Sequence, residues 1–253
     1  MTTGWRVVAA LGRQETVRLT RHPLILSGAI LATALSMESL REHNPLYDYQ
    51  GLTMNQSFVM GPMILIAANL ITRRELRAGT RQLIAATPVT ERRRLAGLLC
   101  AAAGPALLTA VLIMLTATLY RLLGADPVWW PDITEYAVQP VRLLGAGLLG
   151  VMIARWLADP IRPALLACVV AVAMIVVSRS DNAMLRTALS ALFVFNDLHA
   201  KAFDVGWHVG YLLCLDAMAA IGALLATPGP RRALCAVGAV SVAGAVFTGW
   251  AQL

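Results

Sequence analysis

The sequence predicts an all-α, polytopic membrane helix bundle, and three observations support that prediction. Hydrophobic residues make up 58% of the 253 residues and charged residues only 14%, against about 45–50% apolar and about 25% charged residues in a soluble domain. The apolar residues gather in runs, and a helix of about 20 such residues crosses a hydrocarbon core about 30 Å thick. The charged residues stand between these runs. Too few charges remain to cover a soluble core, and the apolar content excludes disorder.

Seven apolar runs are candidates for spanning helices. We expect six core transmembrane helices within residues 1–226, and a seventh within an additional hydrophobic segment, residues 227–253. The first run is the least apolar, and the second and third carry no charged residue. The last is rich in Gly and Ala, which suits close helix packing. The runs lie near residues 22–38, 53–72, 95–120, 139–157, 163–178, 207–226 and 233–250.

The distribution of basic residues predicts that the N-terminus lies on the cytoplasmic side. With that orientation the inner segments carry 15 basic and four acidic residues, and the outer segments carry five basic and nine acidic residues. Cytoplasmic flanks of membrane proteins hold the surplus of Arg and Lys. The net charge of +7 then reflects membrane orientation, and we expect no nucleic-acid partner.

Residues 5–21 have the pattern of an amphipathic helix lying in the cytoplasmic interface. One face holds Trp5, Val8, Ala9, Gly12, Thr16 and Leu19, and the other holds Arg6, Arg13, Gln14, Arg18 and Arg21. We expect the arginines to face lipid headgroups and the chain to turn into the membrane at Pro23. Ala32-Thr33-Ala34 has the form of a signal-peptidase site, but the long patterned region before it favours a retained first span.

The inner loop at 73–94 is long and patterned, unlike the brief turns elsewhere on that side. Five charged residues would continue the second span as a helix: Arg73, Arg74, Glu75, Arg77 and Arg81. A small apolar patch follows at 83–86. A turn and a helix N-cap come next, at Thr87, Pro88, Val89 and Thr90. Such an elbow is suited to insertion into a groove on another protein, and the alternative is an Arg-rich loop held against anionic lipid.

Two outer loops have patterns of their own. Residues 121–138 include Trp129 and Trp130, which indicate an aromatic anchor at the membrane surface. Residues 179–206 are amphipathic, and they predict either a short helix or re-entrant pair that caps the bundle, or an ordinary interfacial loop helix.

No catalytic or metal-binding motif stands out, so we expect neither catalytic residues nor a metal site in this chain. The sequence has no GxxxxGK[ST] phosphate loop, no HExxH and no GxSxG. The four histidines are scattered over both sides of the membrane. The four cysteines lie within apolar stretches, without CxxC spacing, and are expected to pack like small hydrophobic residues.

Polar residues inside the spans are the remaining candidates for a substrate pathway. Asp216 lies near the middle of the 207–226 run, where an unpaired carboxylate costs at least about 2.5 kcal/mol. It is either a substrate or coupling position or a buried helix–helix hydrogen bond. Asn55 and Asn69 on the second span are weaker candidates. Arg142 lies near an outer helix end, and we expect its side chain to snorkel toward water.

Three stretches share the pattern of one family: RQETVRLTRHP (Arg13–Pro23), RRELRAGTRQLIAATPVTERRRLA (Arg73–Ala96) and GWHVGYLLCLDAMAA (Gly206–Ala220). The chain resembles the membrane subunit, or permease, of a bacterial ABC-2 type transporter, which is an ABC exporter. The resemblance frames residues 5–226, and the second stretch is the most specific. The hydrophobic segment at 233–250 departs from the family's six-span pattern.

The resemblance implies a protein of the bacterial cytoplasmic membrane, with an interfacial elbow helix before six core spans. It further implies a second permease, the same or a different chain, and separate ATPase subunits that bind ATP and Mg²⁺, so that this chain holds no cofactor. In the family the loop between the second and third spans is the coupling helix that docks on the ATPase. Carried over, that role falls on Arg73, Arg74, Glu75, Arg77, Arg81, Thr87, Pro88 and Val89.

The expected function is therefore that of a permease subunit in an ATP-driven exporter. The alternative is a non-transporting scaffold or sensor that binds a cytoplasmic partner. Hydrophobic drugs, antibiotics, peptides and lipid-linked glycans all stay open as substrates.

Overall fold

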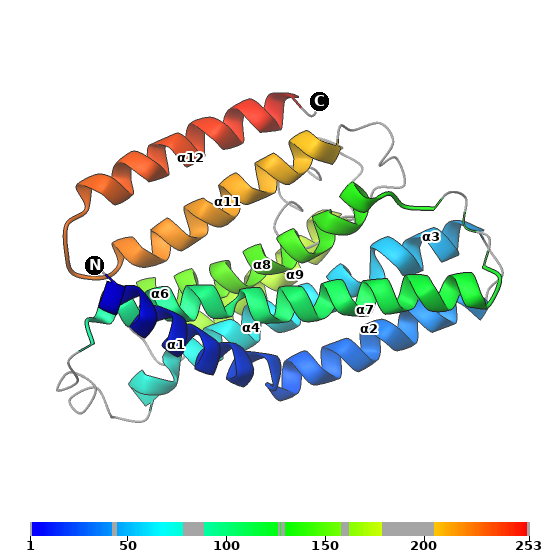
Figure 1. The fold of residues 1–253 in the computed structure, drawn as a ribbon, viewed down its shortest axis with the longest axis horizontal. Helices are drawn as coiled ribbons and strands as arrows, with labels where there is room; N and C mark the ends of the chain where they lie inside the picture. The colour runs from blue at the N-terminus through cyan, green and yellow to red at the C-terminus, as the bar shows by residue number, and fades with distance from the viewer. Residues whose placement is uncertain are drawn as a thin grey trace.

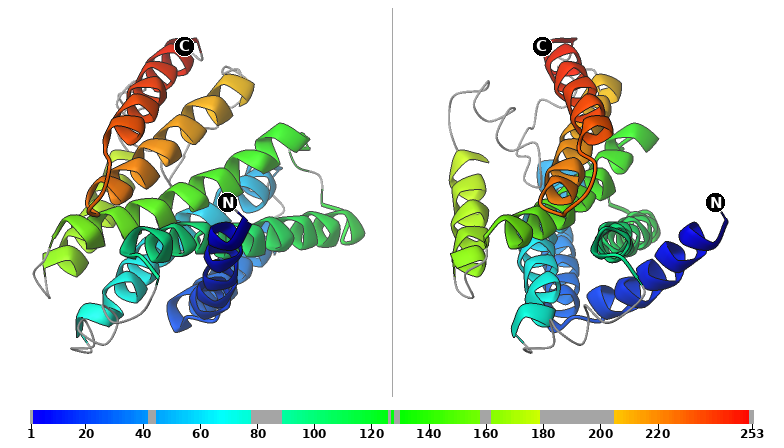
Figure 2. Two further views of the ribbon diagram at one scale, coloured as in Figure 1. Left: turned by 60° about the vertical axis from the view of Figure 1, so that its left-hand side comes forward. Right: turned by 90° about the vertical axis from the view of Figure 1, so that its left-hand side faces the viewer.

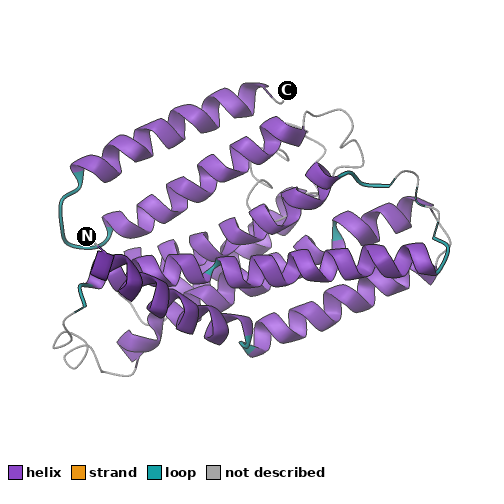
Figure 3. Ribbon diagram, viewed as in Figure 1, coloured by secondary structure: helices purple, strands orange, loops and turns teal. Residues whose placement is uncertain are grey.

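The computed structural model is a bundle of α-helices, and every element within the described residues is helical (Figure 1, Figure 3). The structure describes residues 2–41, 45–77, 89–125, 127, 130–157, 162–178 and 205–251. Within these ranges the helices are α1 (Thr2–Thr20), α2 (Pro23–Arg41), α3 (Pro45–Thr53), α4 (Asn55–Arg77), α6 (Glu91–Ala101), α7 (Ala103–Leu122), α8 (Ile133–Trp156), α9 (Arg162–Ser178), α11 (Val205–Leu225) and α12 (Arg232–Ala251).

Five helical segments among the described residues are long and apolar enough to cross a membrane, which indicates a membrane protein. They are α2, the α6–α7 segment Glu91–Leu122, α8, the Gly206–Leu225 part of α11, and α12. These segments confirm the runs expected near 22–38, 95–120, 139–157, 207–226 and 233–250 as membrane-spanning candidates.

The other two expected spans form helices that fall outside this set. At 23 residues α4 is about 34 Å long and could cross a bilayer, but Asn55, Gln56 and Asn69 lower its apolar character. The apolar part of α9, Ala164–Ala173, is shorter than a span. The expected outer-loop elements at 179–206, apart from the start of α11, lie outside the described residues.

The α6–α7 segment is broken, although the sequence predicts one continuous helix there. Ala102 ends α6 and begins α7, with Gly104 and Pro105 in the first turn of α7. Proline is tolerated in a first helical turn because the N–H that it lacks has no helical partner there. Thr90 is the N-cap of α6, as expected, but its side chain makes no capping hydrogen bond.

α8 lies at the centre of the bundle and α12 at its edge (Figure 1). In the most apolar stretch of α8, 72% of the residues are buried inside the protein, whereas only 11% are buried in the most apolar stretch of α12. α4 packs on one side of α8, and α11 runs along another, with α12 beside it. Gly147 and Gly150 allow α4 and α8 to approach closely, since a Cβ at 150 would meet the backbone carbonyl of Leu65.

α1 lies across α6 and the start of α7 (Figure 1). Gly12 and Gly97 meet at this crossing, where a Cβ on Gly12 would lie 3.3 Å from the carbonyl oxygen of Gly97. Val8, Gly12 and Leu19 are buried, and Arg6, Arg13, Gln14, Arg18 and Arg21 are exposed, as expected. Trp5 and Ala9, expected on the apolar face, are exposed instead, and Glu15 is buried.

His22 lies in the turn that joins α1 to α2. Its Nδ1 accepts a hydrogen bond of 3.3 Å from the backbone N–H of Leu24. Burial lowers the pKa of His22, because the charged imidazolium loses hydration there. The neutral ring is therefore the form that supports this turn.

Replacing Gly150 with Ala is expected to lower the free energy of unfolding by about 1–3 kcal/mol, the usual cost of forcing a methyl group into a packed interface. The new Cβ would press on the backbone of α4, which cannot swing aside as a side chain can. Gly238→Ala is a matched control, because its Cβ would lie an ordinary 3.5 Å from Cγ2 of Ile221. Thermal unfolding of the purified protein measures both variants. Equal midpoints for G150A and the wild type would contradict the close contact.

Candidate functional site

One end of the bundle gathers arginines from several helices. The end of α4, the start of α6, the end of α8 and the α11–α12 turn all lie on the left side of Figure 1, and the turned views in Figure 2 agree. We call this the arginine-rich end, and its described members include Arg73, Arg74, Arg92, Arg93, Arg94, Arg155, Arg231 and Arg232. It is the end at which the 73–94 loop leaves and re-enters the bundle.

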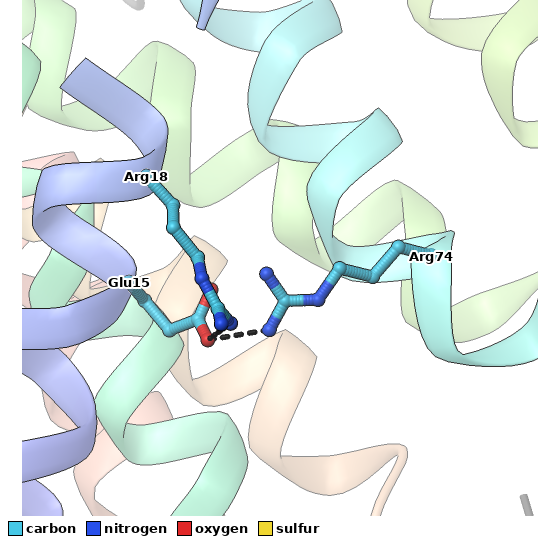
Figure 4. A network of polar contacts seen from close by, with 3 residues as sticks. All are labelled: Glu15, Arg18 and Arg74. Atoms are coloured by element: carbon cyan, nitrogen blue, oxygen red, sulfur yellow. Dashed lines mark hydrogen bonds and ion pairs between the residues drawn. The ribbon is translucent and has the colours of Figure 1, made fainter. Parts of the chain in front are cut away.

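Glu15 joins α1 to α4 at the arginine-rich end. Its Oε1 accepts a hydrogen bond from Nη2 of Arg74 and another, at 3.0 Å, from Nη1 of Arg18 (Figure 4). The carboxylate side chain is 11% exposed. Two guanidinium groups thus share one largely buried carboxylate, and α1 is held to the last turns of α4.

Two further contacts hold the start of α6. Arg155, at the end of α8, donates a hydrogen bond to Oε1 of Glu91. Nη2 of Arg92 donates a hydrogen bond of 3.1 Å to the carbonyl oxygen of Pro230 in the α11–α12 turn. Gly229, next to it, has a φ of 137°, which favours glycine. The first turn of α6 is therefore joined to α8 and to the α11–α12 turn.

The expected coupling residues fall partly within the described ranges. Arg73 is 1% exposed at the end of α4, and Arg74 is bonded to Glu15, so both face the bundle. Glu75 and Arg77 belong to the helical part of α4, and Val89 is half-buried just before α6. Arg81, Thr87 and Pro88 lie outside the described residues.

A row of polar residues runs along the opposite half of α8, and each of them meets a different helix. The spacing of Glu135, Gln139 and Arg142 places them on one helical face. The hydroxyl of Tyr49, on α3, donates a hydrogen bond of 3.3 Å to Oε1 of Glu135, and Ser57, on α4, donates one to Oε1 of Gln139. Nη2 of Arg142 lies 3.0 Å from Nε2 of His208 on α11. We call these six residues the polar seam.

The expectation that Arg142 snorkels to water is wrong. The residue is 1% exposed and its guanidinium points at His208, which is 5% exposed. Its position within α8 places it beside α11, where a neighbouring imidazole supplies a contact that a lipid-facing arginine would lack. A hydropathy pattern places a residue along a span but gives no information about which helix lies beside it.

The three expected pathway residues take part in different contacts. Nδ2 of Asn55 donates a hydrogen bond of 3.1 Å to Oγ of Ser39 on α2, whereas Nδ2 of Asn69 donates one of 3.2 Å to the carbonyl oxygen of Gly150 on α8. Asp216, on α11, is 4% exposed, and neither carboxylate oxygen has a hydrogen-bond partner in the described part of the chain. No contact among the described residues brings the three together.

Most of the polar seam was not predicted from the sequence. Ser57, Gln139 and His208 lie within expected spans but were not among the candidates, and Tyr49 and Glu135 lie in expected outer loops. The i, i+4, i+7 spacing on α8 was the available signal. Among the described residues, no group of three or more His, Cys, Asp or Glu side chains could hold a metal ion.

Neither the known protein-family models nor the curated proteins match this chain in sequence.

We expect a double-mutant cycle of Glu15→Gln and Arg74→Gln to give a coupling free energy near the upper end of about 0.2–1 kcal/mol, the range for accessible ion pairs, because the carboxylate is largely buried. The Glu38–Arg41 pair is a matched control. Its side chains are 61% and 80% exposed, so its coupling should be smaller and more easily screened by salt. Unfolding in denaturant at low and high salt measures both cycles. Equal couplings would contradict a structural role for Glu15.

Proposed function

We propose that this chain is the permease subunit of an ATP-driven exporter of the ABC-2 type, paired with a second permease and driven by separate ATPase subunits. In this proposal α1 lies in the cytoplasmic membrane interface, the arginine-rich end faces the cytoplasm, and α4 and α9 complete the set of six core spans. α12 is then a seventh span beyond the core.

The observation that carries the proposal is that the charged residues on both sides of the 78–88 segment are bonded to other helices. Before it, Arg74 is held by Glu15 of α1. After it, Glu91 is held by Arg155 of α8, and Arg92 by the carbonyl of Pro230. An elbow pushed by a motor protein can move a bundle only if its ends are firmly joined to that bundle. A loop that merely rests on lipid has no need of such contacts.

These contacts support a mechanism of alternating access. Movement of the elbow toward or away from the membrane would act on α4 and α6 directly, and on α8 through the Glu91–Arg155 contact. α8 would in turn act on α11, because packed helices shift as units rather than deform continuously. The polar groups buried between α4, α8 and α11 supply the hydrogen-bonding positions that a pathway through these helices requires.

The proposed orientation predicts which side of the membrane each end of the bundle faces. Thr90→Cys lies at the arginine-rich end and Ile133→Cys at the opposite end, and both positions are exposed. In a background with the four native cysteines replaced, a membrane-impermeant maleimide should label I133C in intact cells and T90C only after permeabilisation. Labelling of T90C in intact cells would overturn the orientation and, with it, the coupling role of the elbow.

The proposed function predicts that an ATPase copurifies with the tagged chain from its native membrane and hydrolyses ATP in the complex. Reversing two elbow charges, Arg77→Glu with Arg81→Glu, should abolish that association because the elbow is the docking surface. Arg231→Glu with Arg232→Glu is the matched control, since it reverses two exposed charges at the same end outside the elbow. ATP hydrolysis and subunit stoichiometry of the purified complexes are measured. The proposal fails if no ATPase accompanies the wild type or if the elbow variant retains it.

A further inference from the structure

Asp216 is a buried acidic residue without a partner in the described part of the chain. It is 4% exposed on α11, a helix long and apolar enough to cross a membrane. Neither of its carboxylate oxygens has a hydrogen-bond partner among the described residues, and none of the ion pairs there involves it. A carboxylate at membrane depth is costly without a partner, and residues of this kind mark the pathways of substrates and ions.

The side of α11 that carries Asp216 faces apolar residues of the bundle. Leu212, Ala219 and Ala223 share its helical face and are all buried. Ala219 and Ala223 pack in the same apolar core as Leu149 of α8. These side chains contain no oxygen, so they cannot supply the several oxygen ligands that a bare metal ion needs. A cation suited to this position must bring apolar groups of its own.

The exposed side of α11 begins next to Asp216. Leu213 is a neighbour on the helix surface, three residues earlier, and is 49% exposed in the described bundle. A compound dissolved in the bilayer can therefore reach α11 close to the carboxylate. Because the carboxylate itself is covered in this conformation, such a compound would meet it when α11 shifts against α8, the movement that alternating access requires.

We propose that Asp216 binds the charged group of a lipophilic organic cation, and that such cations are the substrates of the exporter. The carboxylate supplies the opposite charge, and the apolar side chains on its helical face accommodate the aryl or alkyl groups of the cation. The bound cation in turn offsets the cost of a carboxylate at membrane depth. Of the substrates left open by the sequence, this selects cationic drugs, antibiotics and peptides over lipid-linked glycans, whose phosphates are anionic. The inference rests on the proposed function, because it names the substrate class of that exporter.

The test is equilibrium binding of two cations, tetraphenylphosphonium and tetrabutylammonium, to the full-length protein in lipid nanodiscs, with empty nanodiscs as the correction for partition into lipid. Asp216→Asn removes the charge at nearly constant shape. It should weaken the binding of at least one cation by about ten- to hundredfold, the usual value of a contact with a charged group. Asp216→Glu keeps the charge and should keep the binding. Glu38→Gln removes a carboxylate that is 61% exposed on α2, so it is a matched control that should bind as the wild type does.

Three results would overturn the proposal: no saturable binding of either cation by the wild type, equal binding by D216N, or loss of binding in E38Q. Equal binding by D216N is also the result expected if Asp216 takes up only a proton. If D216N does not reach the membrane, the wild type supplies the measurement. Dicyclohexylcarbodiimide, an apolar reagent that modifies carboxyl groups within membranes, should label Asp216 less when tetraphenylphosphonium is bound, and unchanged labelling would exclude the site.

The outcome is distinguishable from a failure of the proposed function, because binding to the chain needs no ATPase. If an ATPase copurifies but neither cation binds, the substrate class is wrong and the exporter assignment stands. If the cations bind through Asp216 but no ATPase copurifies, the site stands and the exporter assignment is wrong.

Discussion

The rest of the structure depends on the close approach of α4 and α8. Gly150 lets the carbonyl of Leu65 come against the backbone of α8, and Gly147 leaves room for Ala102 of the α6–α7 break. Without a hydrophobic driving force between helices in lipid, such backbone proximity is a main source of packing energy. Because α8 holds α4 on one side and α11 on another, the placement of its polar residues follows from this contact.

The polar groups of the bundle form two sets that differ in their accessibility to water. At the arginine-rich end Glu15 and Glu91 hold guanidinium groups that are partly accessible to water, so these contacts join helix ends without burying a full charge pair. The polar seam is buried except at Glu135, which is half-buried, and its three hydrogen bonds each join α8 to a different helix. Polar groups at membrane depth are costly unless they pair within the protein, so the seam also specifies which helices are neighbours.

The sequence was enough to predict a span wherever the hydropathy of the apolar run is sufficient to identify it. α2, α8, α11 and α12 follow directly from their apolar runs, and so does the exposed arginine face of α1. The break at Ala102 had a local signal in Pro105, which has no N–H for the carbonyl of Ala101 and whose ring crowds that carbonyl, but the uninterrupted apolar run around it indicated one continuous span. α4 was expected from its lack of charge, yet its amide side chains set it apart from the more apolar spans.

The candidate site was predictable in its location but not in its partners. A run of arginines around 73–94 identified the end of the bundle where charge gathers. It gave no indication that Arg73 is buried or that Arg74 reaches Glu15, since that carboxylate lies far away in sequence. For the same reason Arg142 was assigned to water. Pairing between distant segments depends on the packed fold, and local periodicity contains no information about it.

The position of α12 at the edge of the bundle has a consequence for how the chain can vary. On its inner face Gly244 and Gly249 lie against Cys214 and Tyr211 of α11, and Phe247 packs edge-on against Trp207, but only 11% of the most apolar stretch of α12 is buried within the described part of the chain. Exchanges among aliphatic residues at its exposed positions would leave these contacts intact. Among homologous chains, therefore, α12 should drift fastest in sequence while keeping its length and this narrow strip of contacts.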